Sequence, residues 1–198
     1  MAGMNRDGLR AMLAEMDLAG RDAEVVARDR MIELLDSEPR CFRRDAFPGH
    51  FVGGALVLNA DGSRALLHHH RKLDRWLQFG GHCDGEENVL EVARREAREE
   101  CGIDGLVVAS GKPFDLDVHP IPERPGEPWH EHYELRWVLI APEGARPVCS
   151  DESHELRWFT PDEMAALPSD GGTDRMVEKW KALLARRGHR GSRAPGCA

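Results

Sequence analysis

Apolar residues recur at helical spacing from Asp7 to about Ser37, with polar and charged residues between them. One set lies between Leu9 and Met16, and a second lies between Val25 and Leu35. Because spacings of three and four residues place side chains on one helix face, the pattern predicts two N-terminal helices. This region closes at Glu38-Pro39, since a proline disfavours helical backbone in the residue before it.

Beyond that point the pattern changes to short apolar runs bounded by turn residues. The run Phe51–Asn59 ends at Asn59-Ala60-Asp61-Gly62, which predicts a strand followed by a hairpin turn. Further strands are predicted at Ala65–His70, Trp76–Phe79, Leu106–Ser110, Tyr133–Ile140 and Glu155–Phe159. Helices are predicted at Asn88–Cys101, from Pro161 and at Asp174–Arg187, followed by a frayed tail from Gly188. The chain is therefore predicted to be mixed α/β.

Length and charge restrict the classes of function that this chain can have. The 198 residues are enough for one well-buried core, and the net charge is -8. This acidic balance argues against general nucleic-acid binding, which depends on neutralising phosphates with Lys and Arg. No apolar run approaches the roughly 18 residues of a membrane span, and the N-terminus is too polar for a secretory signal, so we expect a cytoplasmic protein. The five cysteines are scattered and contain no CxxC pair, which favours reduced thiols.

The segment from Gly81 to Ile103 has a regular spacing of small and charged residues. Its pattern is G-x5-E-x7-R-E-x-x-E-E-x-G, and the fixed positions are Gly81, Glu87, Arg95, Glu96, Glu99, Glu100 and Gly102. If each residue type has a frequency of ~10 %, a match at all seven positions is expected by chance on the order of 10⁻⁵ times per chain. The spacing is therefore a specific signal.

Three carboxylates of this segment share one face of the predicted helix. Glu96, Glu99 and Glu100 stand at i, i+3 and i+4. Unpartnered, they repel one another, whereas a hard divalent cation that prefers oxygen ligands converts the repulsion into binding. Mg²⁺ is the expected ion, with Mn²⁺ as a substitute. The alternative is a solvated helix whose arginines pair with its acids. An apolar stripe on the opposite side comprises Leu90, Ala93, Ala97 and Cys101.

The residues from Gly81 to Gly102 resemble the Nudix box. Residues 40–165 also resemble a bacterial Nudix subgroup that has GGHxDG before the helix and a later HxHY segment. The resemblance implies an α/β Nudix fold, in which a mixed β-sheet is sandwiched between helices, here with an N-terminal helical extension. It divides the chain into that extension (residues 1–45), a Nudix catalytic domain (46–168), and a C-terminal helix with a flexible tail (169–198).

In Nudix enzymes the glutamates of the box hold metal and position a water. The positions of this sequence that match the metal ligands are Glu96, Glu99, Glu100 and, through its carbonyl, Gly81. By the same resemblance, Arg95 is expected to brace Glu87. The general base is either a box glutamate or a residue outside the box, for which Glu152 and Glu155 are candidates.

The resemblance implies Mg²⁺-dependent hydrolysis of a phosphoanhydride bond by metal-activated water. The expected substrate is a small molecule, either a nucleoside diphosphate linked to another moiety or a related organic pyrophosphate. One alternative is an enzyme like isopentenyl-diphosphate isomerase, for which Cys83 is the only parallel. Another is a non-catalytic nucleotide sensor, although such domains usually have damaged boxes. The N-terminal helices are candidates for a homodimer contact.

Cationic and aromatic residues concentrate directly before the box. Arg71, Lys72 and Arg75 are suited to phosphate contacts, and Trp76 is suited to stacking on a substrate. The segment is therefore a candidate phosphate-facing edge. The alternative is a solvated strand end whose tryptophan lies in the core.

Histidines and acids gather in two later segments, Asp115–His119 and His130–His132. Because alternating positions on a strand point to one face, these side chains can converge, and His82 beside the box glycine can join them. The residues predicted to contact substrate here are His82, His119, His130 and His132. A second transition-metal site and structural histidines are the alternatives.

Overall fold

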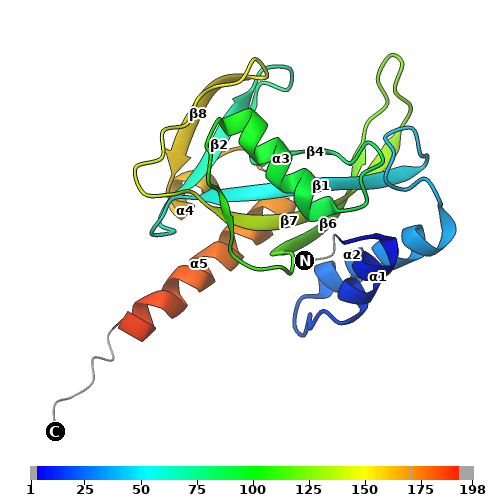
Figure 1. Ribbon diagram of the computed structural model, residues 1–198, viewed down its shortest axis with the longest axis horizontal. Coiled ribbons are helices and arrows are strands. Elements are labelled where there is room, and N and C mark those ends of the chain that lie inside the picture. The colour runs from blue at the N-terminus through cyan, green and yellow to red at the C-terminus, as the bar shows by residue number, and fades with distance from the viewer. Residues whose placement is uncertain (1–3, 170, 192–198) are drawn as a thin grey trace, which may run out of the picture.

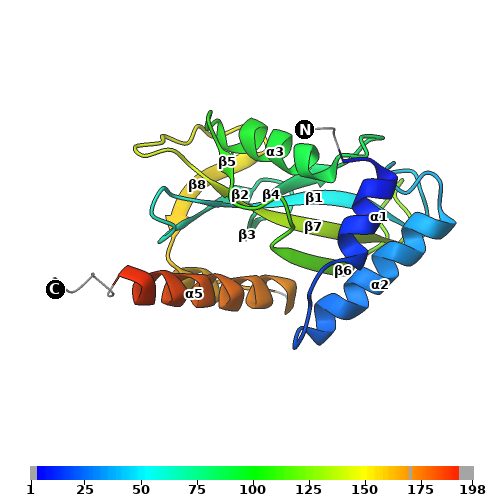
Figure 2. The same cartoon turned by 60° about the horizontal axis from the view of Figure 1, so that its bottom comes forward.

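The computed structural model describes residues 4–169 and 171–191. Within them a sheet of eight strands forms the centre, with helices on both faces (Figures 1 and 2). The strands are β1 (Gly49–Leu58), β2 (Ala65–His70), β3 (Arg75–Leu77), β4 (Phe79–His82), β5 (Val107–Val108), β6 (Asp115–Ile121), β7 (His130–Ile140) and β8 (Ser153–Phe159). The helices are α1 (Arg6–Ala14), α2 (Asp22–Ser37), α3 (Val89–Cys101), α4 (Pro161–Ala165) and α5 (Gly171–Gly191). The predicted mixed α/β sandwich is confirmed.

Strands β1 and β7 form the middle of the sheet. They run parallel, in register from Gly49 opposite Glu131 to Leu58 opposite Ile140. The other pairings are antiparallel, with β2 and β4 on β1, β5 and β6 on β7, and β3 and β8 on β2. Every residue of β1 is buried, as expected for a strand covered on both faces.

Three strands differ from the sequence prediction. The single strand expected at Trp76–Phe79 is two strands, because β3 pairs with β2 whereas β4 pairs with β1. The strand expected at Leu106–Ser110 is reduced to β5. The segment Asp115–Ile121 is a full strand, although its apolar residues are interrupted by acids, a histidine and Pro120. Pairing with the long strand β7 fixes this segment despite its weak local pattern.

Helix α3 lies on one face of the sheet and α5 on the other (Figure 2). A Cβ atom at Gly53 of β1 would lie 2.7 Å from the Val89 carbonyl oxygen and 2.9 Å from the Ala93 nitrogen. Glycine at this position therefore lets the backbone of α3 approach the strand closely. On the opposite face, Met176 and Trp180 of α5 belong to a second core cluster.

The N-terminal helices α1 and α2 lie side by side at one end of the sheet, with α2 next to β6 (Figure 1). Leu9 and Met31 belong to the same core cluster as Phe51 and Leu116, so these helices share the core of the sheet. At the other end of the chain, α5 continues to Gly191. The first residues of the predicted tail are thus helical, and residues 192–198 lie outside the described part.

None of the helices described is both long and apolar enough to cross a membrane.

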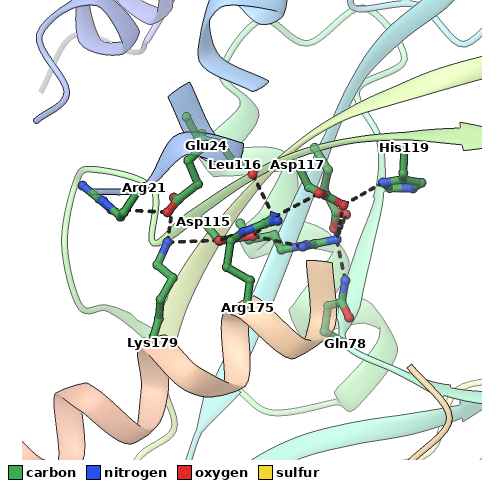
Figure 3. Close-up of polar contacts among 11 residues, drawn as sticks. Arg21, Glu24, Gln78, Asp115, Leu116, Asp117, His119, Arg175 and Lys179 are labelled. Carbon is green, nitrogen blue, oxygen red and sulfur yellow. Dashed lines mark hydrogen bonds and ion pairs between the residues drawn. The ribbon is translucent and has the colours of Figure 1, made fainter. Parts of the chain in front are cut away.

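A network of ion pairs ties α2 and α5 to the sheet (Figure 3). It comprises Glu24 of α2, Asp115 and Asp117 of β6, Glu134 and Arg136 of β7, and Arg175 and Lys179 of α5. Arg136 lies at its centre and is only 2 % exposed. Burial of so many charges is tolerated because each carboxylate faces a cation.

Candidate active site

The helix that carries the three box carboxylates begins and ends where the sequence predicts. The Asn88 side chain accepts a hydrogen bond from the Glu91 backbone N–H at 3.4 Å, which caps the N-terminus. At the C-terminus Gly102 has φ 64°, the left-handed conformation that glycine adopts without strain. Helix α3 is therefore fixed at both ends, and its acidic face is held beside strand β4.

Glu100 is the most buried of the three carboxylates, with 6 % of its surface exposed. It accepts a hydrogen bond from the Gly80 backbone N–H at 3.0 Å, and His68 Nδ1 lies 3.8 Å from its other oxygen. Burial, together with the charges of Glu96, Glu152 and Glu99, raises its pKa to about 8. A neighbouring cation would remove this penalty on the charged form, so the site suits a positive ion.

Gly81 lies directly against Glu96. A Cβ atom at position 81 would lie 2.5 Å from the Glu96 carboxyl carbon and 2.6 Å from one of its oxygens. Only glycine therefore allows the carboxylate to lie against the backbone of β4. The resulting donor set consists of carboxylate oxygens and, from Gly81, a carbonyl, which are the ligands that Mg²⁺ and Mn²⁺ prefer.

Arg95 does not brace Glu87 in the described structure. Its guanidinium donates to Glu96 at 2.6 Å and to the His82 carbonyl at 3.2 Å. Glu87 instead accepts a hydrogen bond from the backbone N–H of Arg6, at the start of α1. The expectation was wrong because Glu87 lies before the first turn of α3 and faces the N-terminal helix, whereas Arg95 lies two turns into α3.

The two base candidates outside the box differ in their position relative to the box carboxylates. Glu152 precedes β8, and its charge contributes to the raised pKa of Glu100. Glu155 pairs across the strands with His69, one residue away from the His68 that faces Glu100. Because neighbouring strand residues point to opposite faces, Glu155 points away from the box carboxylates. The structure thus brings Glu152, but not Glu155, to the acidic cluster.

Sequence reasoning missed two groups that lie against this cluster, the backbone N–H of Gly80 and the ring of His68. The Ser153 hydroxyl in turn lies 2.9 Å from His68 Nδ1. His68 lies within the strand predicted at Ala65–His70, whose first four residues are all buried.

The cationic residues before the box differ in their surroundings. Arg71 donates from its guanidinium to the carbonyls of Asp151 and Ser153, at 3.0 and 2.9 Å. It therefore fixes the loop that carries Glu152. Lys72 and Arg75 are exposed.

Trp76 lies at the second core cluster, on the α5 side of the sheet. Its ring stacks on His69, with centroids 5.2 Å apart, and packs edge-on against Phe159 at 5.0 Å. Because it pairs with His69 rather than His68, it points away from the face that carries Glu100. This is the core position that the sequence offered as the alternative to substrate stacking.

The predicted substrate-contacting histidines lie together, but on the sheet face opposite α3. His130 and His132 share a face of β7 with Glu134 and Arg136, and His119 lies opposite His132 on β6. His82 lies on β4, with its ring 5.2 Å from that of His132. The group includes His50 of β1 as well, a residue that sequence reasoning missed.

Comparison with known proteins assigns the class. The family model of the NUDIX domain matches residues 50–180. This match covers most of the chain, and the chain belongs to the NUDIX domain family. It is a hydrolase that acts on phosphoanhydride bonds.

Individual relatives agree with this class. The chain is 30 % identical over 132 residues to a probable DHNTP pyrophosphohydrolase of Lactococcus lactis, a match that covers 62 % of this chain and 77 % of the relative. Among solved structures, a C. elegans Ap4A hydrolase in a binary complex has a TM-score of 0.57 at 17 % identity, covering 69 % of this chain and 98 % of its own. The E. coli dihydroneopterin triphosphate pyrophosphohydrolase has a TM-score of 0.54 at 21 % identity, covering 65 % and 92 %. The two structural matches support the fold.

Proposed function

We propose that the protein hydrolyses a phosphoanhydride bond with the help of Mg²⁺. Its substrate is a nucleoside diphosphate linked to another moiety, or a related organic pyrophosphate. The observation that carries the proposal is the buried Glu100 beside Glu96 and Glu99, a cluster whose charge is unfavourable without a cation. The net charge of -8 also favours a cation that screens the approach of an anionic substrate.

The residues that would hold the ion are Glu96, Glu99, Glu100 and the carbonyl of Gly81. Once bound, a divalent cation neutralises the diphosphate and lowers the pKa of an attacking water. Arg95 keeps Glu96 in place, and the Gly80 N–H and His68 orient Glu100. These contacts fix the carboxylates before substrate arrives, which limits reorganisation during the reaction.

Glu152 is the base that we propose to accept the proton of the attacking water. It is exposed, it lies close enough to Glu100 to affect its pKa, and its carbonyl accepts a hydrogen bond from the Arg71 backbone N–H at 2.8 Å. The guanidinium of Arg71 further anchors the same loop. Arg71 is thus proposed as a positioning residue for the base.

A panel of organic pyrophosphates tests the function. It should include nucleoside diphosphates linked to sugars and alcohols, dihydroneopterin triphosphate and Ap4A, because two of the similar proteins are named for the last two compounds. We expect phosphate or nucleotide release that requires added Mg²⁺ and stops with a chelator. Nucleotide binding without turnover of any compound would instead favour the non-catalytic sensor. Product identification would show which phosphorus is attacked.

Isomerase chemistry is disfavoured by the position of Cys83. This residue is 1 % exposed and belongs to the main core cluster. Burial raises the pKa of its thiol far above the ordinary range, so the reactive thiolate is not formed near neutral pH.

Gly81→Ala is predicted to impair catalysis without unfolding the protein. The new methyl group would collide with the Glu96 carboxylate, the mobile end of a flexible side chain, so the carboxylate moves rather than the backbone. A displacement of about 1 Å in a catalytic group can cost roughly 100-fold in rate. We expect kcat to fall by that order while the melting temperature stays close to that of the wild type.

Gly111→Ala is the matched control. No heavy atom outside its chain neighbours lies within 4 Å of a Cβ at that position, and its backbone has no positive φ. Its activity should equal that of the wild type. Full activity of Gly81→Ala would show that the contact between Gly81 and Glu96 has no role in the reaction.

A further inference from the structure

Four histidines from three strands gather on the sheet face opposite the α3 carboxylates. They are His50 of β1, His82 of β4, and His130 and His132 of β7. The ring centroid of His50 lies 4.9 Å from that of His130, 5.0 Å from that of His132 and 5.2 Å from that of His82. His50 and His132 are direct partners in the parallel pairing of β1 with β7.

The ring nitrogens of this group point toward one another. Nε2 of His130 lies 3.3 Å from Nε2 of His132, and one nitrogen from each of His50, His130 and His132 lies within 4.8 Å of the others. Two nitrogens bound to one tetrahedral ion at 2.0–2.1 Å are about 3.3–3.4 Å apart. The spacing of His130 and His132 already matches that geometry.

Backbone carbonyls orient two of these rings. Nδ1 of His130 lies 2.9 Å from the Pro128 carbonyl oxygen, and Nδ1 of His50 lies 3.3 Å from that of Ala46. Because a carbonyl only accepts, Nδ1 carries the proton and Nε2 keeps its lone pair. A carbonyl that orients a histidine in this way is the usual support of a metal-binding imidazole.

The remaining nitrogen of His50 has no partner. His50 is 1 % exposed, and its Nε2 is buried without a hydrogen bond among the described residues. Leaving a buried polar atom unpaired is unfavourable. A cation between the rings would satisfy this nitrogen.

The surroundings of the group exclude most water, because His130, like His50, is fully buried. The Glu127 carboxylate lies 3.9 Å from Nε2 of His130 and offers an oxygen at the edge of the group.

The neighbouring group Asp117, His119 and Glu134 also brings ligand atoms within 4.8 Å of one another. Both of its carboxylates, however, are already bonded to Arg136, at 3.2 and 2.6 Å. Their charge is thus neutralised within the protein. In the histidine group, by contrast, Nε2 of His50 has no hydrogen-bond partner among the described residues, and Nε2 of His130 contacts only another imidazole nitrogen, Nε2 of His132, at 3.3 Å.

We propose that His50, His130 and His132 bind one divalent transition-metal ion of the Zn²⁺ type, with His82 or Glu127 able to complete the coordination. The site is separate from the carboxylates of the box and differs from them in its nitrogen ligands, which select borderline ions over Mg²⁺. An ion there links the start of β1 to the start of β7 and stabilises that end of the two central strands.

Titration of the tag-free, full-length protein with Co²⁺ tests the site. The protein is first stripped with a strong chelator and then kept in excess Mg²⁺, which occupies oxygen sites. We expect one equivalent of Co²⁺ to give the strong visible absorption of a four-coordinate ion, and Zn²⁺ to bleach it. Zn²⁺ should also raise the melting temperature.

Three variants assign the ligands. The double variant His130→Ala/His132→Ala should lose the Co²⁺ absorption and the Zn²⁺-dependent rise in melting temperature. His154→Ala, which removes an exposed histidine, should keep both. Glu99→Gln should also keep both while losing Mg²⁺-dependent hydrolysis, so the two sites can fail independently. Absorption that survives in the double variant would overturn the proposal.

Because the double variant removes buried side chains, a second measurement uses the wild-type protein alone. X-ray absorption of the Zn²⁺-loaded chain should show at least two imidazole nitrogens at about 2.0–2.1 Å. A shell made only of oxygen would also overturn the proposal.

Discussion

Glu100→Gln is expected to slow hydrolysis strongly and, at the same time, to stabilise the metal-free protein. Gln is close in shape and still accepts the hydrogen bond of the Gly80 N–H, but it lacks the negative charge that holds a cation. A bound metal supplies several kcal/mol of transition-state stabilisation, so the rate should fall by roughly 100- to 1,000-fold. Steady-state kinetics with Mg²⁺ on the best substrate of the panel measures the loss.

The gain in stability follows from the raised pKa of Glu100. Burial raises this pKa from 4.5 to about 8. Below pH 4.5 the carboxyl is protonated in both states, and the substitution removes no penalty. Between pH 4.5 and about 8 the unfolded chain releases the proton, whereas the folded protein keeps it. The free energy of unfolding of the wild type therefore falls, as the pH rises, by at most about 1.4 kcal/mol per pH unit. The neutral Gln escapes this penalty.

Urea unfolding in the presence of a chelator, from pH 5 to pH 9, measures the effect. The free energy of unfolding of Glu100→Gln should exceed that of the wild type by an amount that grows with pH and levels off above about pH 8. Glu99→Gln is the matched control, because Glu99 lies on the same helix face but is exposed. It should lose activity without gaining stability. An advantage of Glu100→Gln that is equal at every pH would contradict the assigned burial penalty.

The sequence predicted α3 and its acidic face because both depend on local rules. Glu96, Glu99 and Glu100 share a face by helical geometry alone, and Asn88 and Gly102 mark the ends of the helix through their own backbone and side-chain preferences. The family match and the observed fold confirm these inferences. Residues that act through local geometry can therefore be identified in a single sequence.

Features that depend on strand pairing could not be predicted in the same way. His50 lies at the start of an apolar run, and only the parallel pairing of β1 with β7 brings it to His132. Trp76 lies close in sequence to Arg71, yet the split of one expected strand into β3 and β4 turns it toward α5. Register decides which face a strand residue occupies, and it is fixed by partners that are distant in the sequence.

Arg136→Ala should be the most destabilising single substitution in the sheet. The side chain is 2 % exposed and bonds to Asp115, Asp117 and Glu134, at 3.1, 3.2 and 2.6 Å. Removing it leaves three carboxylates close together in the interior. Breaking a buried pair in this way costs about 3–5 kcal/mol, a large part of the roughly 5–15 kcal/mol that stabilises a typical domain.

The pH dependence of this loss identifies its cause. In the wild type, although burial acts in the opposite direction, hydrogen bonds and the charges of Arg136 and Arg175 lower the pKa of Asp115 and Asp117 below 3.8. Stability from such carboxylates is present above their unfolded pKa and is lost as the pH falls through the folded one. The difference in free energy of unfolding between the wild type and Arg136→Ala should therefore become smaller below about pH 4.

Two further variants separate charge from shape. Arg136→Lys keeps the positive charge but loses the planar fork that contacts several carboxylates at once, so we expect an intermediate loss. Arg10→Ala removes an arginine that pairs with Asp36 on the surface and should barely change unfolding, since water already screens that pair. If Arg136→Ala is as stable as Arg10→Ala, then Arg175 and Lys179 must neutralise the carboxylates of β6 without help. Arg136 would then act on the polar side chains that share its face of β7 with the histidines, and it would contribute little to the stability of the sheet.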